Sequence, residues 1–251
     1  MTLWKLEIAR LIRTKRVIAL VGVFLFFGLT DPLITTYLDK ILAFFQSSLE
    51  GAGLSLPAPT VAQALADYAG DAAQIGTIVV VAIAAGTMNF DAPPEMGVFL
   101  RTRVRSISRI LLPRVVVMTL AAGTAQLLGT VAAGYESAVL LGSLPWAALI
   151  AFAIVDYLAL GLVVLIVSAL AQSLRSTVAI VMASLGVLVA MPILGIVPEI
   201  GRWLPTRLLG SLAELSSGGS AVSLWPAVLT TIALGGACWW MSVVQAGRRE
   251  L

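Results

Sequence analysis

The sequence predicts an all-α membrane protein with six transmembrane helices. The 251-residue chain is 59% hydrophobic and only 12% charged, whereas soluble domains carry about 25% charged residues. The apolar residues gather in long runs, and about 20 such residues cross a bilayer as a helix. Most of the 16 basic residues fall into segments that share one side of the membrane if the chain crosses it six times.

The chain begins with a predicted amphipathic helix over residues 2–16. At about 100° per residue, Trp4, Ile8 and Leu11 gather on one face and Arg13 lies on the other. An apolar face with a tryptophan, opposite a basic face, is typical of a helix lying in the headgroup region of a membrane. The alternative is that these basic residues only flank the first span.

The six predicted spans form a single transmembrane domain over residues 1–251. They cover residues 17–38, 72–90, 110–133, 145–170, 177–197 and 221–244. Pro32 falls within the first span, where a proline usually kinks a helix. The external segment 198–220 mixes leucines and a tryptophan with charged residues, so we expect it to be semi-buried, with surrounding protein or water to satisfy its backbone. The sequence leaves open whether this segment is re-entrant.

The most basic connection, residues 91–109, lies between the second and third spans and is predicted to face the cytoplasm, as are both termini. Asp91 can cap a helix, and Glu95 suits its first turn, where the helix dipole favours an acid. Phe99 and Leu100 then lie roughly on one side with Met96. The sequence therefore predicts a short cytoplasmic helix, with an ordinary positively charged loop as the alternative.

The composition also excludes several kinds of site. There is no histidine, and Cys238 is the only cysteine, which excludes histidine-based catalysis and metal sites built from cysteine pairs. No Walker A pattern occurs, so we expect no ATP site in this chain. We expect no catalytic residue, no metal ion and no cofactor here.

Acidic residues within the predicted spans are the remaining functional candidates. Asp156 lies near the middle of the fourth span, is followed by Tyr157, and Asp31 lies in the outer half of the first. Ionisable residues at such depth commonly mark transport pathways. A buried hydrogen bond that holds helices together is the alternative.

This layout resembles the type-2 ABC-transporter permeases, the membrane subunits of a class of ATP-driven exporters. The shared features are an N-terminal interfacial helix, six spans, both termini in the cytoplasm, a cytoplasmic helix after the second span and a semi-buried external segment before the sixth. The family motif runs from an acidic residue and a glycine through a leucine-rich turn to Thr, Ser and Arg. The positions that look like this motif are Glu95, Gly97, Leu100, Thr102, Ser106 or Ser108, Arg109 and Arg114.

The resemblance implies that segment 91–109 is a coupling helix that docks on a separate ATP-binding subunit. Glu95, Phe99, Leu100 and Arg101 would make that contact, and ATP and Mg²⁺ would bind in the partner. The resemblance also implies a second permease chain, identical or related, and a location in the cell membrane. Residues Asp156, Tyr157 and Asp31 are then candidates for the substrate pathway.

Two other functions stay open. An ATP-independent channel or secondary transporter would carry more polar residues in its spans and often an internal repeat, and no repeat is visible here. An intramembrane enzyme would need a pair of aspartates or a serine with a lysine. The transported substrate is not identified, although an apolar lining would suit a hydrophobic or amphipathic molecule.

Overall fold

The computed structural model describes residues 3–46, 58–89 and 108–248, which are helical apart from short connections and contain no strand. Six helical stretches in this part of the chain are long and apolar enough to cross a membrane, which confirms the all-α class and the number of candidate spans. Their bounds are Arg16–Leu38, Val61–Met88, Ser108–Leu141, Trp146–Ser173, Thr177–Leu194 and Ala221–Gly247.

The chain starts with helix α1, Leu3–Arg13, which is separated from the next helix by Lys15 in a left-handed conformation with φ 56°. Leu11 is buried, whereas Trp4 and Ile8 on the predicted apolar face are exposed. A helix that packs one edge on the bundle and leaves apolar side chains outward has the form expected of an interfacial helix. Its position at a membrane surface stays a prediction.

Helix α2, Arg16–Gln46, runs on past Pro32 and beyond the predicted end of the first span at Leu38. The hydroxyl of Thr35 donates to the carbonyl of Asp31 and that of Thr36 to the carbonyl of Pro32. The threonines therefore bond within the helix around the proline.

The second long stretch differs from the prediction at its start. Helix α3, Val61–Asp71, passes through a π-helical turn, η1, Ala72–Gly76, into helix α4, Thr77–Met88. The predicted second span begins only at residue 72, whereas the helical stretch begins at Val61, and Tyr68 within it is fully buried. Asp67 accepts a hydrogen bond of 2.8 Å from Thr35, which joins α3 to α2.

Helices α6, Ser108–Leu141, and α7, Trp146–Ser173, form the centre of the bundle. Half of the most apolar stretch of each is buried, the highest share among the six candidate spans of the described residues. Helix α6 continues to Leu141, past the predicted end of the third span at residue 133. Gly142, with φ 110°, ends this extension in a conformation that side chains disfavour.

Helix α8 is the shortest of the six, and a folded segment fills the space beyond its end. Its 18 residues rise about 27 Å, against about 51 Å for the 34 residues of α6. The next short helices pack on α7 and α3, and their leucines Leu208 and Leu212 are fully buried. The elements that follow α8, Thr177–Leu194, are α9, Pro198–Gly201, α10, Thr206–Leu209, α11, Ser211–Ser216, η2, Ala221–Leu224, and α12, Trp225–Arg248.

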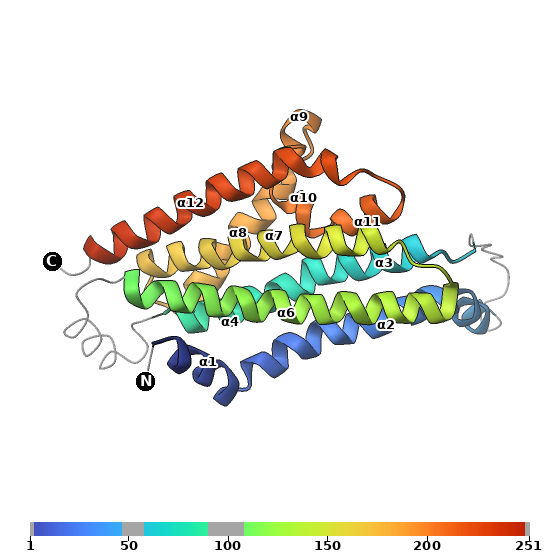
Figure 1. The fold of residues 1–251 in the computed structure, drawn as a ribbon, viewed down its shortest axis with the longest axis horizontal. Coiled ribbons are helices and arrows are strands. Elements are labelled where there is room, and N and C mark those ends of the chain that lie inside the picture. The colour runs from blue at the N-terminus through green and yellow to red at the C-terminus, as the bar shows by residue number, and fades with distance from the viewer. Residues whose placement is uncertain (1–2, 47–57, 90–107, 249–251) are drawn as a thin grey trace.

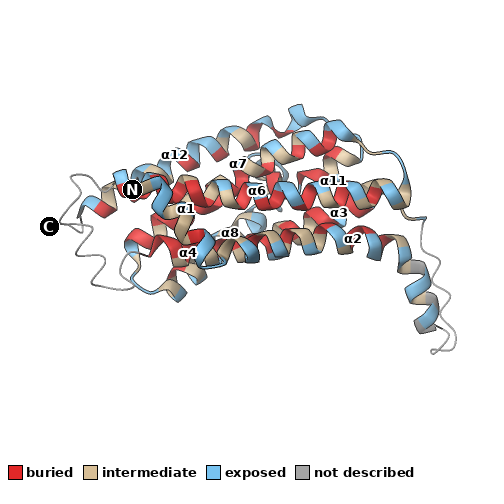
Figure 2. Ribbon diagram, turned by 60° about the horizontal axis from the view of Figure 1, so that its bottom comes forward, coloured by how far each residue is buried: buried red, intermediate tan, exposed pale blue. Residues whose placement is uncertain are grey.

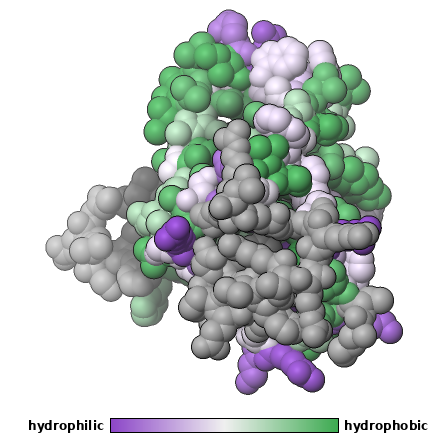
Figure 3. Space-filling model, turned by 90° about the vertical axis from the view of Figure 1, so that its left-hand side faces the viewer, coloured by the Kyte–Doolittle hydropathy of each residue, from purple (hydrophilic) through white to green (hydrophobic). Residues whose placement is uncertain are grey.

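Both ends of the described chain lie at one end of the bundle, together with the residues that flank segment 90–107 (Figure 1). We call this the terminal end and the opposite end the distal end. Buried residues concentrate on α4, α6 and α7, while α8 and α12 are largely exposed (Figure 2). Figure 3 looks onto the terminal end, where hydrophobic side chains cover the flanks and hydrophilic ones form separate patches at the rim.

Candidate functional site

The residues predicted to couple to an ATPase, Glu95, Phe99, Leu100 and Arg101, lie outside the described residues. The structure does describe both flanks of this segment. Each flank carries a buried polar side chain that bonds to another part of the bundle, and together these contacts define the base from which segment 90–107 leaves the membrane helices.

Asn89 fixes the first flank. It follows the last residue of α4, is 4% exposed and adopts an extended conformation that ends the helix. Its Nδ2 donates to the carbonyl oxygen of Arg175 at 3.1 Å and to Oγ1 of Thr177 at 2.9 Å. The end of α4 is thereby held to the turn between α7 and α8.

Arg114 fixes the second flank. It lies on α6, is 7% exposed, and its Nε donates to Oε1 of Glu7 on α1 at 2.7 Å. Its Nη1 donates to the carbonyl oxygen of Thr87 at 3.2 Å. A buried charge needs such a partner, because isolated charges in a low-dielectric interior are costly. This one side chain therefore joins α1, α4 and α6.

We call Glu7, Thr87, Asn89, Arg114 and Thr177 the base cluster. The sequence predicts a role for Arg114 only within the family motif, and Glu7 falls within the predicted amphipathic helix 2–16. Two features of the sequence mark Arg114 and Glu7 as unusual. Arg114 lies within an apolar helix, and Glu7 is the only acid in residues 2–16.

A second group of polar side chains lies inside the bundle at Tyr68. The hydroxyl of Tyr68 donates to the carbonyl of Gln126 at 3.2 Å and lies 3.3 Å from Oγ1 of Thr130. Nε2 of Gln126 donates to the same Thr130 oxygen at 2.9 Å. Asp156 of α7 is buried, with 4% of its surface exposed.

The other two pathway candidates, Asp31 and Tyr157, lie in different surroundings. Asp31 is 6% exposed, and its Oδ2 has no hydrogen-bond partner among the described residues. The ring of Tyr157 instead packs on Gly123 of α6, where no larger residue would fit. Asp31 and Asp156 are therefore both buried, whereas Tyr157 lies in a helix-packing contact.

These acids do not form a metal centre. Asp67 and Asp71 of α3 act electrostatically on Asp31, yet no three acidic, histidine or cysteine side chains in the described ranges are arranged to hold a metal ion. The residues found by the structure and missed by the sequence here are Tyr68, Gln126 and Thr130. Gln126 gave a signal, as a polar residue among apolar neighbours in the third predicted span.

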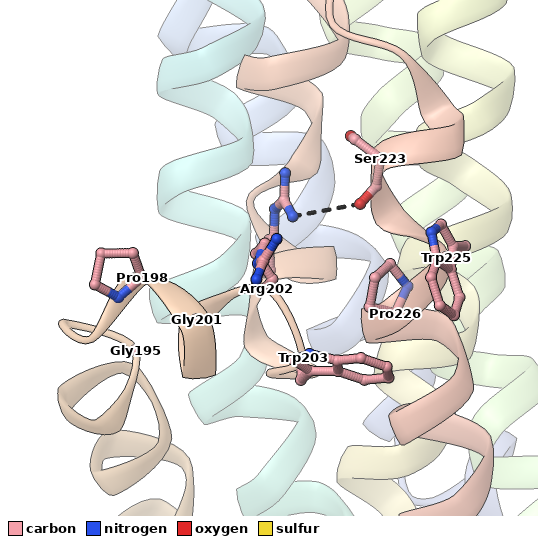
Figure 4. Close-up of a pocket in the computed structure, with 9 residues that line it drawn as sticks. Gly195, Pro198, Gly201, Arg202, Trp203, Ser223, Trp225 and Pro226 are labelled. Carbon is pink, nitrogen blue, oxygen red and sulfur yellow. Dashed lines mark hydrogen bonds between the residues drawn. The ribbon is translucent and has the colours of Figure 1, made fainter.

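Two cavities accompany these clusters, and the first of them is lined in part by Thr130 of the Tyr68 group. An apolar groove of about 520 Å³ runs between α6 and α7 and includes Tyr135 and Trp146. A more polar cavity of about 660 Å³ lies between α9 and the start of α12 (Figure 4). Its walls include Arg202 and Arg207.

An ion pair closes one side of the polar cavity. Nη2 of Arg207 lies 2.8 Å from Oε1 and 2.9 Å from Oε2 of Glu214, and the Ser223 hydroxyl donates to Glu214 Oε1 at 2.7 Å. Burial raises the pKa of Glu214, but the hydrogen bonds from Ser223 and Arg207 and the charge of Arg207 outweigh this effect. The pKa of Glu214 therefore lies below its ordinary value.

Comparisons with known proteins give no relative from which a function could be transferred. No protein-family model matches the chain, and no curated protein matches it either.

Proposed function

We propose that this chain is the permease subunit of an ATP-driven ABC exporter. It would form the substrate pathway in the cell membrane, with both termini in the cytoplasm, and would act with a separate ATP-binding subunit that holds ATP and Mg²⁺. The six apolar helices and the resemblance of layout and motif support this proposal.

The base cluster is the observation that supports coupling most directly. A segment that is displaced by an ATP-binding subunit can move the membrane helices only if its ends are fixed to them, because coupling passes through contiguous contacts. Asn89 fixes one end to the α7–α8 turn, and Arg114 fixes the other to Glu7 of α1. Movement of segment 90–107 would then reach α1, α4, α6 and α8 together.

The least covered helices support a second permease chain. Only 11% of the most apolar stretch of α8 and 22% of that of α12 are buried. Gly186 on α8 and Gly236 on α12 have open space where a side chain would begin. Small residues on such faces let another transmembrane helix approach closely. The partner chain would pack on these faces.

An ATP-independent channel or secondary transporter is the second candidate. The observation in its favour is that two acids of the candidate spans, Asp31 and Asp156, are buried. Buried ionisable groups in membrane helices often mark ion pathways. If Asp156 serves the pathway in either mechanism, Asp156→Asn should lower transport and leave assembly intact.

The proposal is tested by co-expressing the chain with the ATP-binding-cassette subunit encoded nearest to it. A tag on the ATPase should retain the chain during purification, and replacing Phe99 and Leu100 by alanine should release it, because buried apolar anchors contribute most to such contacts. Arg103→Ala is the matched control and should bind normally. Full binding and full ATPase stimulation by a chain with Glu95, Phe99 and Leu100 all replaced by alanine would contradict the proposal.

The base cluster gives a second arm to this experiment. Asn89→Ala should leave the two subunits associated while lowering the ATPase rate of the complex, because the docking residues are unchanged and the connection to α8 is lost. Transport by the purified chain alone in proteoliposomes, driven by an ion gradient and unaffected by ATP, would favour the channel or secondary transporter instead.

A further inference from the structure

The polar cavity between α9 and α12 lies where a membrane boundary is expected. It opens at Gly195, directly after α8, and reaches Trp225 at the start of α12. The roughly 27 Å rise of α8 nearly equals the hydrocarbon thickness of about 30 Å. If the start of α8 beside Arg175 lies at one membrane surface, its far end lies near the opposite boundary of the hydrocarbon core.

Two tryptophans support this depth. Trp203 and Trp225 meet edge to face, with ring centroids 5.6 Å apart, and both line the cavity (Figure 4). Indole rings are enriched at the level of the lipid headgroups. The Thr230 hydroxyl of α12 donates to the carbonyl of Trp203, which fixes this wall of the cavity to α12.

The charge of the cavity favours an anion. Its lining contains two arginines and no acid. Arg207 forms the ion pair with Glu214. Its Nη1 also donates to the carbonyl oxygen of Ser223 at 3.4 Å, shown as the dashed line in Figure 4. Arg202 is exposed, and no side-chain hydrogen bond of Arg202 is found in the part of the chain that the structure describes. Glu199 on the neighbouring α9 does not line the cavity.

A free guanidinium beside an apolar wall is suited to one class of ligand. The planar fork of arginine matches two oxygens of a phosphate, and the rings of Trp203 and Trp225 offer a surface for glycerol and the first methylenes of an acyl chain. The volume of about 660 Å³ lies within the usual range of small-molecule sites, about 300–1,000 Å³. We propose that this cavity binds the phosphate headgroup of an anionic lipid, with Arg202 as its ligand and Arg207 as a support for the wall. This site does not depend on the exporter proposal.

The test is lipid titration of the purified chain, followed by native mass spectrometry, with palmitoyl-oleoyl phosphatidylglycerol and the corresponding phosphatidylcholine as probes. Phosphatidylglycerol should bind about tenfold more tightly, and Arg202→Gln should remove about this factor, as expected for a hydrogen bond to a charged group. Arg175→Gln, an exposed arginine at the terminal end, is the matched control and should keep wild-type binding. Arg202→Lys should retain part of the preference, because it keeps the charge without the fork.

Several results would overturn the proposal. Equal binding of the two lipids would do so, as would wild-type lipid preference in Arg202→Gln. If Arg202→Gln fails to fold, Arg202→Lys replaces it in the test. Wild-type affinity of Arg202→Lys for both lipids would count against a bidentate phosphate site. Millimolar inorganic phosphate should compete only weakly with the lipid. If inorganic phosphate alone stabilised the folded chain to the same extent as phosphatidylglycerol, the cavity would be a site for a soluble anion.

Discussion

The bundle has a closely packed half, α2, α3, α6 and α7, and an open half, α8 and α12. The difference is clearest at glycines. A side chain at Gly129 of α6 would begin 2.6 Å from both the Phe24 carbonyl oxygen and the Tyr68 hydroxyl, whereas one at Gly186 of α8 would meet nothing within 4 Å. Lipid is as apolar as a helix surface, so exposure of apolar residues costs little there. Close contact at small residues, and not burial of apolar area alone, therefore distinguishes the packed helix interfaces from the open faces.

The buried ion pair of the packed half should give the largest effect. Glu7→Ala leaves Arg114 buried without its charged partner, and loss of one member of such a pair costs about 3 kcal/mol. We expect a large fall in the temperature of unfolding in detergent. The double variant Glu7→Ala, Arg114→Met should be more stable than the sum of the two single effects predicts, because the two residues are in contact. An unchanged unfolding temperature in Glu7→Ala would show that α1 is held by other contacts.

Glycine substitutions test the comparison itself. Gly129→Ala should destabilise the chain by about 2 kcal/mol, because the new methyl group meets backbone and a hydroxyl that must move. Gly186→Ala and Gly236→Ala have open space and should change the stability of the isolated chain by less than about 0.5 kcal/mol. Thermal unfolding of the three variants in one detergent measures this difference. Equal effects at all three positions would remove the distinction between the two halves.

The Tyr68 hydroxyl should contribute less. Tyr68→Phe removes the bonds to Gln126 and Thr130 and should cost about 1 kcal/mol, the typical net value of a hydrogen bond. It also makes room beside Gly129, so Gly129→Ala should cost less in the Tyr68→Phe background than in the wild type. The Phe24 carbonyl still limits this rescue. Strict additivity of the two changes would place Tyr68 away from Gly129.

The smallest effect should come from the ion pair between Arg207 and Glu214. Because the pKa of Glu214 is lowered in the folded chain, its stabilisation is complete above the ordinary glutamate pKa and is lost as the pH falls through the lower folded value. The pair is partly exposed, so its contribution is at most about 1 kcal/mol. Unfolding temperatures at about pH 7 and about pH 3 should therefore differ less in Glu214→Gln than in the wild type. The same pH dependence in both chains would mean that this pair adds no stability.

Runs of apolar residues predicted the number of long helices, because each span needs about 20 such residues and little else. The second candidate span begins at Val61, whereas the predicted span begins at residue 72. Asp67 and Asp71 interrupt the apolar run there, and the bond from Thr35 that satisfies Asp67 comes from a helix distant in sequence. Sequence patterns record local periodicity but not the partner that satisfies a polar group.

The candidate sites show the same limit. Asp156 was found by its depth in a span, but the hydrogen bond between Tyr68 and Gln126 joins residues 58 positions apart on two helices. The bond between Glu7 and Arg114 joins residues 107 positions apart. Such pairs follow from the packing of helices, which a single sequence does not specify.

The π-helical turn η1 keeps the same face of the second long helix turned towards the bundle along its whole length. Its buried residues recur every four positions, at Ala64, Tyr68, Ala72, Gly76, Val80 and Ala84. In an α-helix with 3.6 residues per turn, a four-residue repeat rotates by about 40° at each step. The wide turn at Ala72–Gly76 takes up one residue and so about 100° of this accumulated phase. Deleting one residue from this turn would leave both helices intact and rotate the face of α3 away from that of α4.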